Sequence, residues 1–275
     1  FYEGEHDLVR DVGEDSHGTM MAGLLVADGK FYGAAPGVNL SIALALGPTG
    51  TSGQEDRVAQ AIRWCRITQK ADIVSLSLGS DPGEGMGIQS ETVLAVQEAL
   101  DAGIFVVAAA GNTGDDASIN DVSVPANMRG VIAVGTSTRS GSVWSDSANG
   151  SLFDPYSQEN RSYPNQKPEV SAPGVLLFST TSTQIMPPYA YSTGTSDSTV
   201  LVTGALALIL ELHGTALAGD DGVFDVEEME IVKRSLASSC DKTAISGSPH
   251  DVRGGYGLLD AAQWASDIAF ELNLG

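Results

Sequence analysis

The chain has 275 residues, of which 42 % are hydrophobic and 18 % charged, as in a folded protein and not in a disordered one. Thirty-five acidic residues against 14 basic ones give a formal net charge of −21, which argues against nucleic acid as a partner because phosphate backbones are repelled. The longest nearly apolar stretch, residues 199–212, is too short to span a bilayer, so no membrane span is expected. No signal peptide opens the chain, and because it begins with Phe1 we expect a processed piece of a longer product.

The acidic residues are scattered along the chain and not gathered in a tail, so a solvated acidic surface is expected. Adaptation to high salt, secretion and calcium binding each fit such a composition. Cys65 and Cys240 are the only cysteines, and no Cys-x-x-Cys pair is present. Each lies in a segment with helical spacing, so we expect buried free thiols and no disulfide framework.

Apolar runs alternate with amphipathic stretches through the first half of the chain. The runs are apolar on both faces, as in parallel strands that helices cover on either side. The sequence therefore predicts an α/β fold, with a doubly wound, mostly parallel sheet and helices on both faces. In chain order, the predicted elements are a strand at 38–45, a helix at 55–70, a strand at 72–78, a helix at 91–102 and strands at 104–110 and 131–134.

The C-terminal part becomes helical. Residues 199–212 form a smooth apolar run that ends at Gly214, which predicts a buried helix. Asp225 followed by Glu228 predicts a capping box at the start of the next helix, and the acidic residues there do not have EF-hand spacing. Between them and the strands, residues 141–167 are rich in Ser, Asn and Pro and predict a surface loop.

Polar residues follow several of the predicted elements at matching places. His17 opens a helix of small residues, Gly79 and Asn112 follow predicted strands, and Ser196 stands where the buried helix begins. Ligands of open parallel sheets bind beyond the carboxyl ends of the strands, so these side chains are expected to converge. Taken singly, each has an ordinary explanation: a polar helix start for His17, a helix cap for Ser196 and a turn for Asn112.

Together, these residues lie in motifs that resemble the ordered signatures of the subtilisin-like serine proteases (subtilases). The resemblance runs from about residue 10 to residue 265. The main motifs are His17-Gly-Thr-Met-Met-Ala-Gly, Ser77-Leu-Gly, Ala109-Ala-Gly-Asn, Ala172-Pro-Gly and Gly194-Thr-Ser, and minor ones are Ser123-Val-Pro-Ala, Lys167-Pro-Glu-Val and Gly255-Tyr-Gly-Leu-Leu-Asp-Ala.

This resemblance implies a hydrolase that cleaves peptide bonds through an acyl-enzyme. Ser196 would be the nucleophile, His17 its general base, and Asn112 with the Ser196 backbone N–H an oxyanion hole. The remaining motif residues would bind substrate. Ser77, Leu78 and Gly79 would pair with the substrate backbone, Ala109, Ala110 and Gly111 would form a wall of the primary specificity pocket, and Ser123 its floor.

One part of the family pattern is missing. Subtilases carry a catalytic Asp in an Asp-Ser/Thr-Gly turn at the end of a strand, a few tens of residues before the His. Asp7, Asp11 and Asp15 precede His17, but they resemble the variable acidic loop before the His motif. We therefore expect residues 1–275 to form a single subtilisin-like catalytic domain that lacks this strand, with the Asp on a separate N-terminal fragment of the same precursor.

Two further features bear on activity. The family usually has Met after the catalytic Ser, whereas this chain has Asp197, which either benefits from the helix dipole or places a negative charge at the site. Asp115, Asp116 and Asp121 lie on the loop after Asn112. They either form a solvated acidic loop or give the enzyme a preference for Lys or Arg before the scissile bond.

Three hypotheses about function follow. The first is an endopeptidase with a protein or peptide substrate. The second is an inactive subtilase-like scaffold that binds peptides in an extended groove, and the third is an acyl transferase or peptide ligase in which an amine resolves the acyl-enzyme. No cofactor is required for this chemistry. The resemblance also allows structural calcium, without naming ligands, and implies an extracellular or secreted location.

Overall fold

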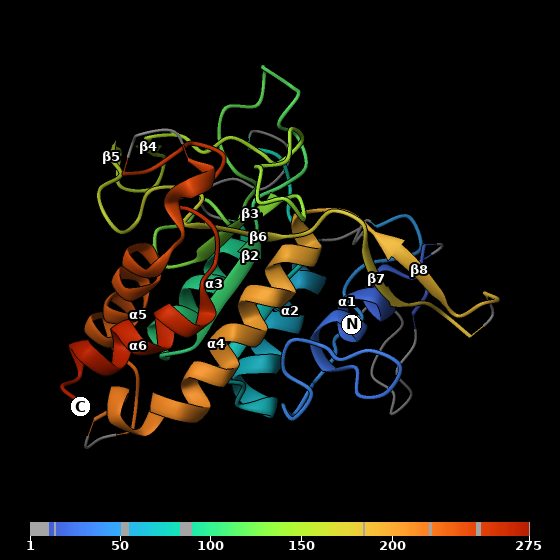
Figure 1. Ribbon diagram of the computed structural model, residues 1–275, viewed down its shortest axis with the longest axis horizontal. Coiled ribbons are helices and arrows are strands. Elements are labelled where there is room, and N and C mark those ends of the chain that lie inside the picture. Colours follow the sequence, from blue (N-terminus) through green and yellow to red (C-terminus); the bar gives the residue numbers. More distant parts are fainter. Residues whose placement is uncertain are drawn as a thin grey trace.

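Four parallel strands form the main sheet of the computed structural model, which describes residues 11–13, 15–50, 55–82, 90–183, 185–219, 222–245 and 249–274 (Figure 1). Their order is β1 (Ile73–Leu76), β2 (Phe105–Ala109), β3 (Ile132–Ser137) and β6 (Val170–Pro173). Every residue of β2 and β3 is buried, so both faces of the sheet are covered. The predicted α/β class with a parallel sheet is confirmed.

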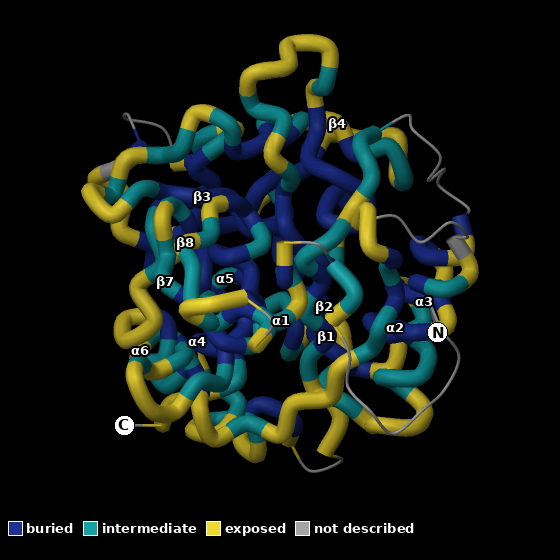
Figure 2. Tube along the Cα trace, turned by 90° about the vertical axis from the view of Figure 1, so that its right-hand side faces the viewer, coloured by how far each residue is buried: buried dark blue, intermediate teal, exposed yellow. Residues whose placement is uncertain are grey.

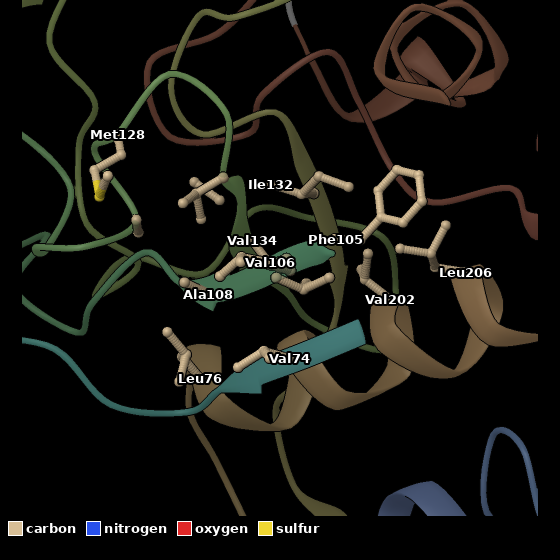
Figure 3. Close-up of a cluster of buried hydrophobic side chains, with 14 of the residues drawn as sticks. Val74, Leu76, Phe105, Val106, Ala108, Met128, Ile132, Val134, Val202 and Leu206 are labelled. Atoms are coloured by element: carbon tan, nitrogen blue, oxygen red, sulfur yellow. The ribbon is translucent and has the colours of Figure 1, made fainter. Parts of the chain in front are cut away.

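A long helix, α4 (Thr195–Leu217), packs against all four strands. Its residues Val202 and Leu206 point toward Phe105 of the sheet (Figure 3). The helix begins four residues before the predicted start and ends five after the predicted end. Within the described part of the chain it is also the one helix long and apolar enough to cross a membrane. Its packing against the sheet identifies it as a helix of the core.

The other elements surround this core, and Figure 2 shows the buried trace concentrated around the sheet. Helix α2 (Glu55–Trp64) pairs with α3 (Glu91–Asp101), which packs on β2, and α5 (Val226–Ser239) pairs with α6 (Ala261–Glu271). Helix α1 (His17–Val26) packs on α4 and on β7 (Leu177–Thr180). The remaining elements are a π-helix that continues α2 (Cys65–Gln69), a 3₁₀-helix (Lys242–Ala244), the hairpin of β4 (Phe153–Asp154) with β5 (Glu159–Asn160), and β8 (Tyr189–Ser192), which forms a hairpin with β7.

The capping box predicted for α5 is confirmed. The Asp225 side chain accepts hydrogen bonds from the backbone of Glu227 and Glu228, and the Glu228 carboxylate accepts one from the Asp225 backbone. These bonds satisfy backbone donors that the first turn of a helix leaves free. Both cysteines are free thiols, as predicted; Cys240 is buried, which raises its pKa to about 12, and Cys65 is half-buried.

The predicted strand at 38–45 is wrong, because these residues join no ladder. Leu40 and Ile42 are 40 % and 44 % exposed, although Ala45 packs into the core. A strand needs a partner for its backbone groups. Strand β1 lies at the end of the sheet and pairs with β2 alone, so among the described residues its second edge has no partner.

The segment 141–167 is mostly irregular, as predicted, apart from the short β4–β5 hairpin, and it is not only a surface loop. Ala148, Arg161, Asn165 and Lys167 are buried. Polar groups of this segment can be buried because they find hydrogen-bonding or ionic partners in the interior. The Arg161 guanidinium, for example, pairs with the Asp121 carboxylate. A pattern of polar residues alone does not reveal such pairing.

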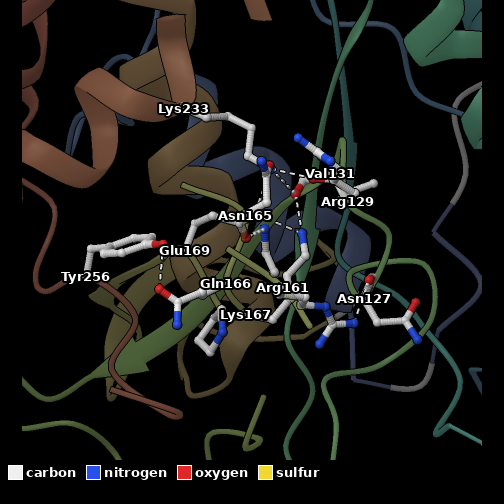
Figure 4. A network of polar contacts seen from close by, with 12 residues as sticks. Asn127, Arg129, Val131, Arg161, Asn165, Gln166, Lys167, Glu169, Lys233 and Tyr256 are labelled. Carbon is white, nitrogen blue, oxygen red and sulfur yellow. Dashed lines mark hydrogen bonds and ion pairs between the residues drawn. The ribbon is translucent and has the colours of Figure 1, made fainter. Parts of the chain in front are cut away.

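Two lysines share one buried carboxylate, that of Glu169, next to β3 (Figure 4). Glu169 Oε1 lies 2.9 Å from Lys167 Nζ and 2.7 Å from Lys233 Nζ, and Glu169 Oε2 accepts from the Ala133 backbone at 2.8 Å. Both lysines also donate to the Val131 carbonyl. Burial lowers the pKa of Lys167 to about 7, against the opposing charge of Glu169. The cluster fixes α5, which carries Lys233, to the segments around β3.

Glu169→Gln is expected to lower the free energy of unfolding by about 3–5 kcal/mol, because it leaves two buried ammonium groups without a counter-charge. Urea denaturation of both proteins measures the change. A matched control is Glu91→Gln, which removes an exposed partner of Arg63 and should cost less than about 1 kcal/mol. Equal effects of the two substitutions would show that the buried cluster contributes little to stability.

Candidate functional site

Ser196 lies in the first turn of α4, next to the carboxyl end of β1. The Ser77 hydroxyl donates to the Ser196 carbonyl at 3.1 Å, and the Ser196 hydroxyl lies 3.4 Å from the Ser77 carbonyl. These two contacts tie the start of α4 to the residue that follows the strand. The second distance is long for a hydrogen bond between a hydroxyl and a carbonyl, so the Ser196 hydroxyl is only weakly held.

Asn112 follows β2 and lies beside the same turn. Its Oδ1 accepts from the Thr195 backbone N–H at 2.9 Å and from the Thr195 hydroxyl at 3.0 Å. A backbone N–H can only donate, so the amide oxygen must face Thr195 and the Nδ2 group must point elsewhere. Nδ2 lies 3.3 Å from the point where a side chain on Gly194 would begin. The amide therefore presents its donors beside the turn that carries Ser196.

Thr195 is the residue that sequence reasoning did not single out. Its hydroxyl accepts from the Gly111 backbone at 3.2 Å and donates to Asn112, so it joins the end of β2 to the start of α4. The only indication of this role in the sequence is the Thr of the Gly194-Thr-Ser triplet. Thr is frequent at helix starts, however, and the triplet alone does not show which backbone group its hydroxyl would bond.

The predicted substrate-binding residues lie around Ser123. A side chain at Gly79 would begin 2.9 Å from Ser123 Cβ, and one at Gly111, which has φ +107°, would begin 2.4 Å from Ser123 Oγ. The Ser123 backbone donates to the Ala110 carbonyl at 2.7 Å, and Ser80 bridges Val124 in antiparallel fashion. Gly79, Ala110 and Gly111 thus all lie next to Ser123.

His17 is the first residue of α1, and its side chain is half-buried. Helix α1 packs against α4 and against β7, where Ser179 and Thr180 donate to the carbonyls of Met20 and Thr19. The structure thus brings the helix of His17 to the helix of Ser196. Within the described part of the chain, the imidazole itself makes no hydrogen bond.

Two acidic residues before His17 serve the start of α1. Asp11 Oδ2 accepts from the Thr19 backbone at 2.7 Å and from the Thr19 hydroxyl at 2.6 Å. Asp15 Oδ1 accepts from the His17 backbone at 3.1 Å. Both carboxylates satisfy free backbone donors of the helix and neither contacts the imidazole ring. Asp7 lies outside the described residues.

Asp197 is buried directly after Ser196, with 1 % of its surface exposed. Its Oδ2 accepts from the Ser192 hydroxyl at 2.9 Å, whereas its Oδ1 is buried and finds no partner among the described residues. Burial raises the pKa of this carboxyl to about 6, and the hydrogen bonds from the Ser192 hydroxyl and from the backbone N–H of Asp197 itself oppose that shift only in part. Burial therefore outweighs both hydrogen bonds.

For the acidic loop, the interpretation as solvated is wrong at Asp121. Its carboxylate forms two bonds with Arg161, at 2.8 and 2.9 Å, and is buried. The guanidinium neutralises this charge, so Asp121 cannot attract a basic substrate residue. Asp115 and Asp116 are exposed, and a basic preference that rests on them stays a prediction.

Calcium remains an expectation without named ligands. Over the described ranges, no three His, Cys, Asp or Glu residues gather as a metal site would require. Carboxylates such as those of Asp121 and Glu169 form ion pairs with basic side chains.

Comparison with known proteins identifies the family. The family model described as the subtilase family, Peptidase_S8, matches residues 4–253, and the chain belongs to this family. It is 36 % identical over 205 residues to Subtilisin E of Bacillus subtilis (strain 168), a match that covers 73 % of this chain and 47 % of that protein. It is 34 % identical over 212 residues to the Major intracellular serine protease of the same organism, covering 75 % and 58 %. The chain thus spans about half the length of these relatives.

Solved structures show the same fold. The self-cleaved protease domain of PatA matches with a TM-score of 0.69 and 21 % identity, over 95 % of this chain and 86 % of that one. The prenylagaramide maturation protease PagA matches with a TM-score of 0.64 and 21 % identity, over 92 % and 82 %. The predicted doubly wound, subtilisin-like architecture is confirmed.

Proposed function

We propose that this chain is the catalytic domain of a serine endopeptidase in which Ser196 is the nucleophile. The observation that carries the proposal is the junction of three segments at the start of α4. Ser77 holds the Ser196 turn, and Thr195 orients the Asn112 amide beside it. A scaffold that only bound peptides would have no need for a weakly held hydroxyl next to oriented donors.

The reaction begins when His17 takes the proton of the Ser196 hydroxyl and the oxygen attacks the substrate carbonyl carbon. The carbonyl oxygen becomes negative and receives hydrogen bonds from Asn112 Nδ2 and from the Ser196 backbone N–H, a donor in the first turn of α4. His17 then gives its proton to the leaving amine, and an acyl-enzyme remains. Water, activated by His17 in the same way, releases the acid and restores Ser196.

Substrate would lie along the segments around Ser123. Residues 77–79 leave the sheet and offer backbone groups to an extended peptide, which would add as a further strand. Ala109, Ala110 and Gly111 would form one wall of the primary pocket and Ser123 its floor. The contacts of Ser123 with positions 79 and 111 support this placement, since any side chain on either glycine would clash.

The catalytic Asp would come from an upstream segment of the same precursor. The free edge of β1 supports this proposal, as does the exposure of Leu40 and Ile42 in a segment with a strand-like sequence. An added strand between β1 and residues 38–45 would pair with both and cover their apolar side chains. The carboxyl end of a strand in that position would lie beside Ser77, at the same edge of the sheet as Ser196.

Two matching structures are described as proteases, one as self-cleaved and one as a maturation protease. These descriptions support a protein or peptide substrate and a processed chain. A relative named an intracellular serine protease matches as well as a subtilisin does. The family therefore does not fix the compartment, and an extracellular or secreted location stays a prediction.

Asn112→Ala is expected to lower kcat by about 10²–10³-fold, the loss known for the oxyanion-hole Asn in members of this family. The measurement compares hydrolysis of a peptide library by both proteins, together with the rate at which a fluorophosphonate probe labels Ser196. Asn149→Ala is a matched control, since Asn149 bonds Arg253 and lies outside the proposed site. An unchanged rate in Asn112→Ala, or a probe adduct on another residue, would contradict the proposed function.

A further inference from the structure

The carboxyl of Asp197 has too few partners for a buried charge. Apart from the backbone N–H of Asp197 itself, it receives a hydrogen bond from the Ser192 hydroxyl alone among the described residues, and its second oxygen is buried without a partner among them. Over the same residues, no cation forms an ion pair with it, whereas the buried carboxylate of Asp121 pairs with Arg161 and that of Glu169 pairs with two lysines. Removing a carboxylate from water without such compensation favours its neutral form.

This carboxyl lies close to where the oxyanion would form. Asp197 Oδ2 and Asn112 Nδ2 are 3.7 and 3.3 Å from the same point, the position where a side chain on Gly194 would begin. The carboxyl and the oxyanion donor therefore flank one glycine of the nucleophile turn. A negative charge on Asp197 would oppose the negative charge that develops on the substrate oxygen, and because Asp197 is buried, water would screen the two charges less than it does at the surface.

We propose that Asp197 is a proton-controlled brake on the reaction at Ser196: the neutral carboxyl permits the oxyanion, and the ionised carboxylate disfavours it. This inference rests on the proposed endopeptidase function. The pKa of the Asp197 carboxyl is raised to about 6, so the carboxyl loses its proton within the pH range in which a His-dependent enzyme works. The peptidase would then be restrained at neutral pH and released on mild acidification.

The residues named around Asp197 carry no charge that would complicate the assignment of the pH effect to its carboxyl. Ser192 comes from β8, Asn112 from the loop after β2, and Gly194 and Ser196 from the same turn; all four are uncharged. His17, on the helix that packs against α4, and the upstream Asp that the proposed function places at the site are common to all variants. A comparison between variants removes the pH effects that these groups share.

The test is the ratio of kcat/KM for Asp197→Asn to that of the unmodified protein, measured from pH 5 to pH 8. We expect this ratio to be near one at pH 5 and to rise to about tenfold at pH 8, with the inverse ratio falling through its midpoint at the pKa of Asp197. Ser192→Ala gives a second variant that keeps the carboxyl. It removes the hydrogen bond that favours the charged form, so the alkaline decline in its rate should move to higher pH.

A ratio independent of pH, or a Ser192→Ala profile that moves to lower pH, would overturn the inference. Carbon-13 NMR titration of the aspartate carboxyls, with Asp197→Asn used for assignment, provides a readout that needs no activity. A hydrolytic protein in which Asp197 titrates near the ordinary value for Asp overturns this inference alone. Absence of hydrolysis from both proteins when the upstream segment is supplied overturns the proposed function, and this inference with it.

Discussion

Ser196→Ala is expected to lower kcat for peptide hydrolysis by about 10⁶-fold, the loss that removal of the nucleophile causes in members of this family. The substitution removes one oxygen from a half-buried side chain whose single hydroxyl contact is long, so the fold should be unaffected. Hydrolysis rates and intact masses after fluorophosphonate treatment measure the effect. The adduct should disappear together with the activity.

Ser266→Ala is the matched control for this variant. Ser266 is exposed on α6, and its hydroxyl bonds the backbone of its own helix, so its loss should leave kcat unchanged. Product masses also separate two of the hypotheses, because a peptide ligase would join fragments where an endopeptidase adds water. Activity that persists in Ser196→Ala would show that the start of α4 is not the reaction centre.

An upstream polypeptide that carries the Asp-bearing strand is expected to raise turnover by about 10⁴-fold over this chain alone. This is the order of the loss that follows removal of the Asp in members of the family. A full-length precursor, expressed with and without an Asp→Asn substitution in that strand, tests the expectation. The substituted precursor should keep the strand and lose the activity, so it separates the chemical role of the Asp from its structural setting.

The same strand should leave a physical trace that does not depend on catalysis. Leu40 and Ile42 are 40 % and 44 % exposed, so covering them would stabilise the protein by about 1 kcal/mol each, the corresponding share of the value for burying a whole side chain. Backbone amides of β1 and of residues 38–45 should become protected from hydrogen exchange when the strand is present. If their exchange is unchanged and turnover does not rise, the catalytic Asp does not occupy this position.

Strong local patterns predicted much of the fold. Strand β2 could be predicted because its residues are apolar on both faces, and α5 because Asp225 and Glu228 form a capping box. The strand expected at 38–45 did not form, since a strand also depends on a neighbour that its own sequence does not specify. The length of α4 was underestimated because its first turn is polar where it reaches the site.

For the site, the motif order indicated which residues would approach one another, but not their hydrogen bonds. The placement of Ser196 beside Asn112 depends on Thr195, whose hydroxyl contacts backbone 84 residues away. Asp121 was expected to be solvated, and only the folded chain shows that Arg161, far along the sequence, neutralises it. The burial of Asp197 likewise depends on Ser192 and on the packing around α4, which no local pattern describes.

The junction at Ser196 has a consequence for the order of events during synthesis. Ser77 lies 119 residues before Ser196, and Asn112 lies 83 residues before Thr195. The helix that carries Ser196 is also the one that packs against all four strands, so the nucleophile reaches its place only when the hydrophobic core closes. If the chain is the proposed endopeptidase, a partly translated or partly folded chain would have no assembled centre, and this would protect it and neighbouring nascent chains from premature cleavage.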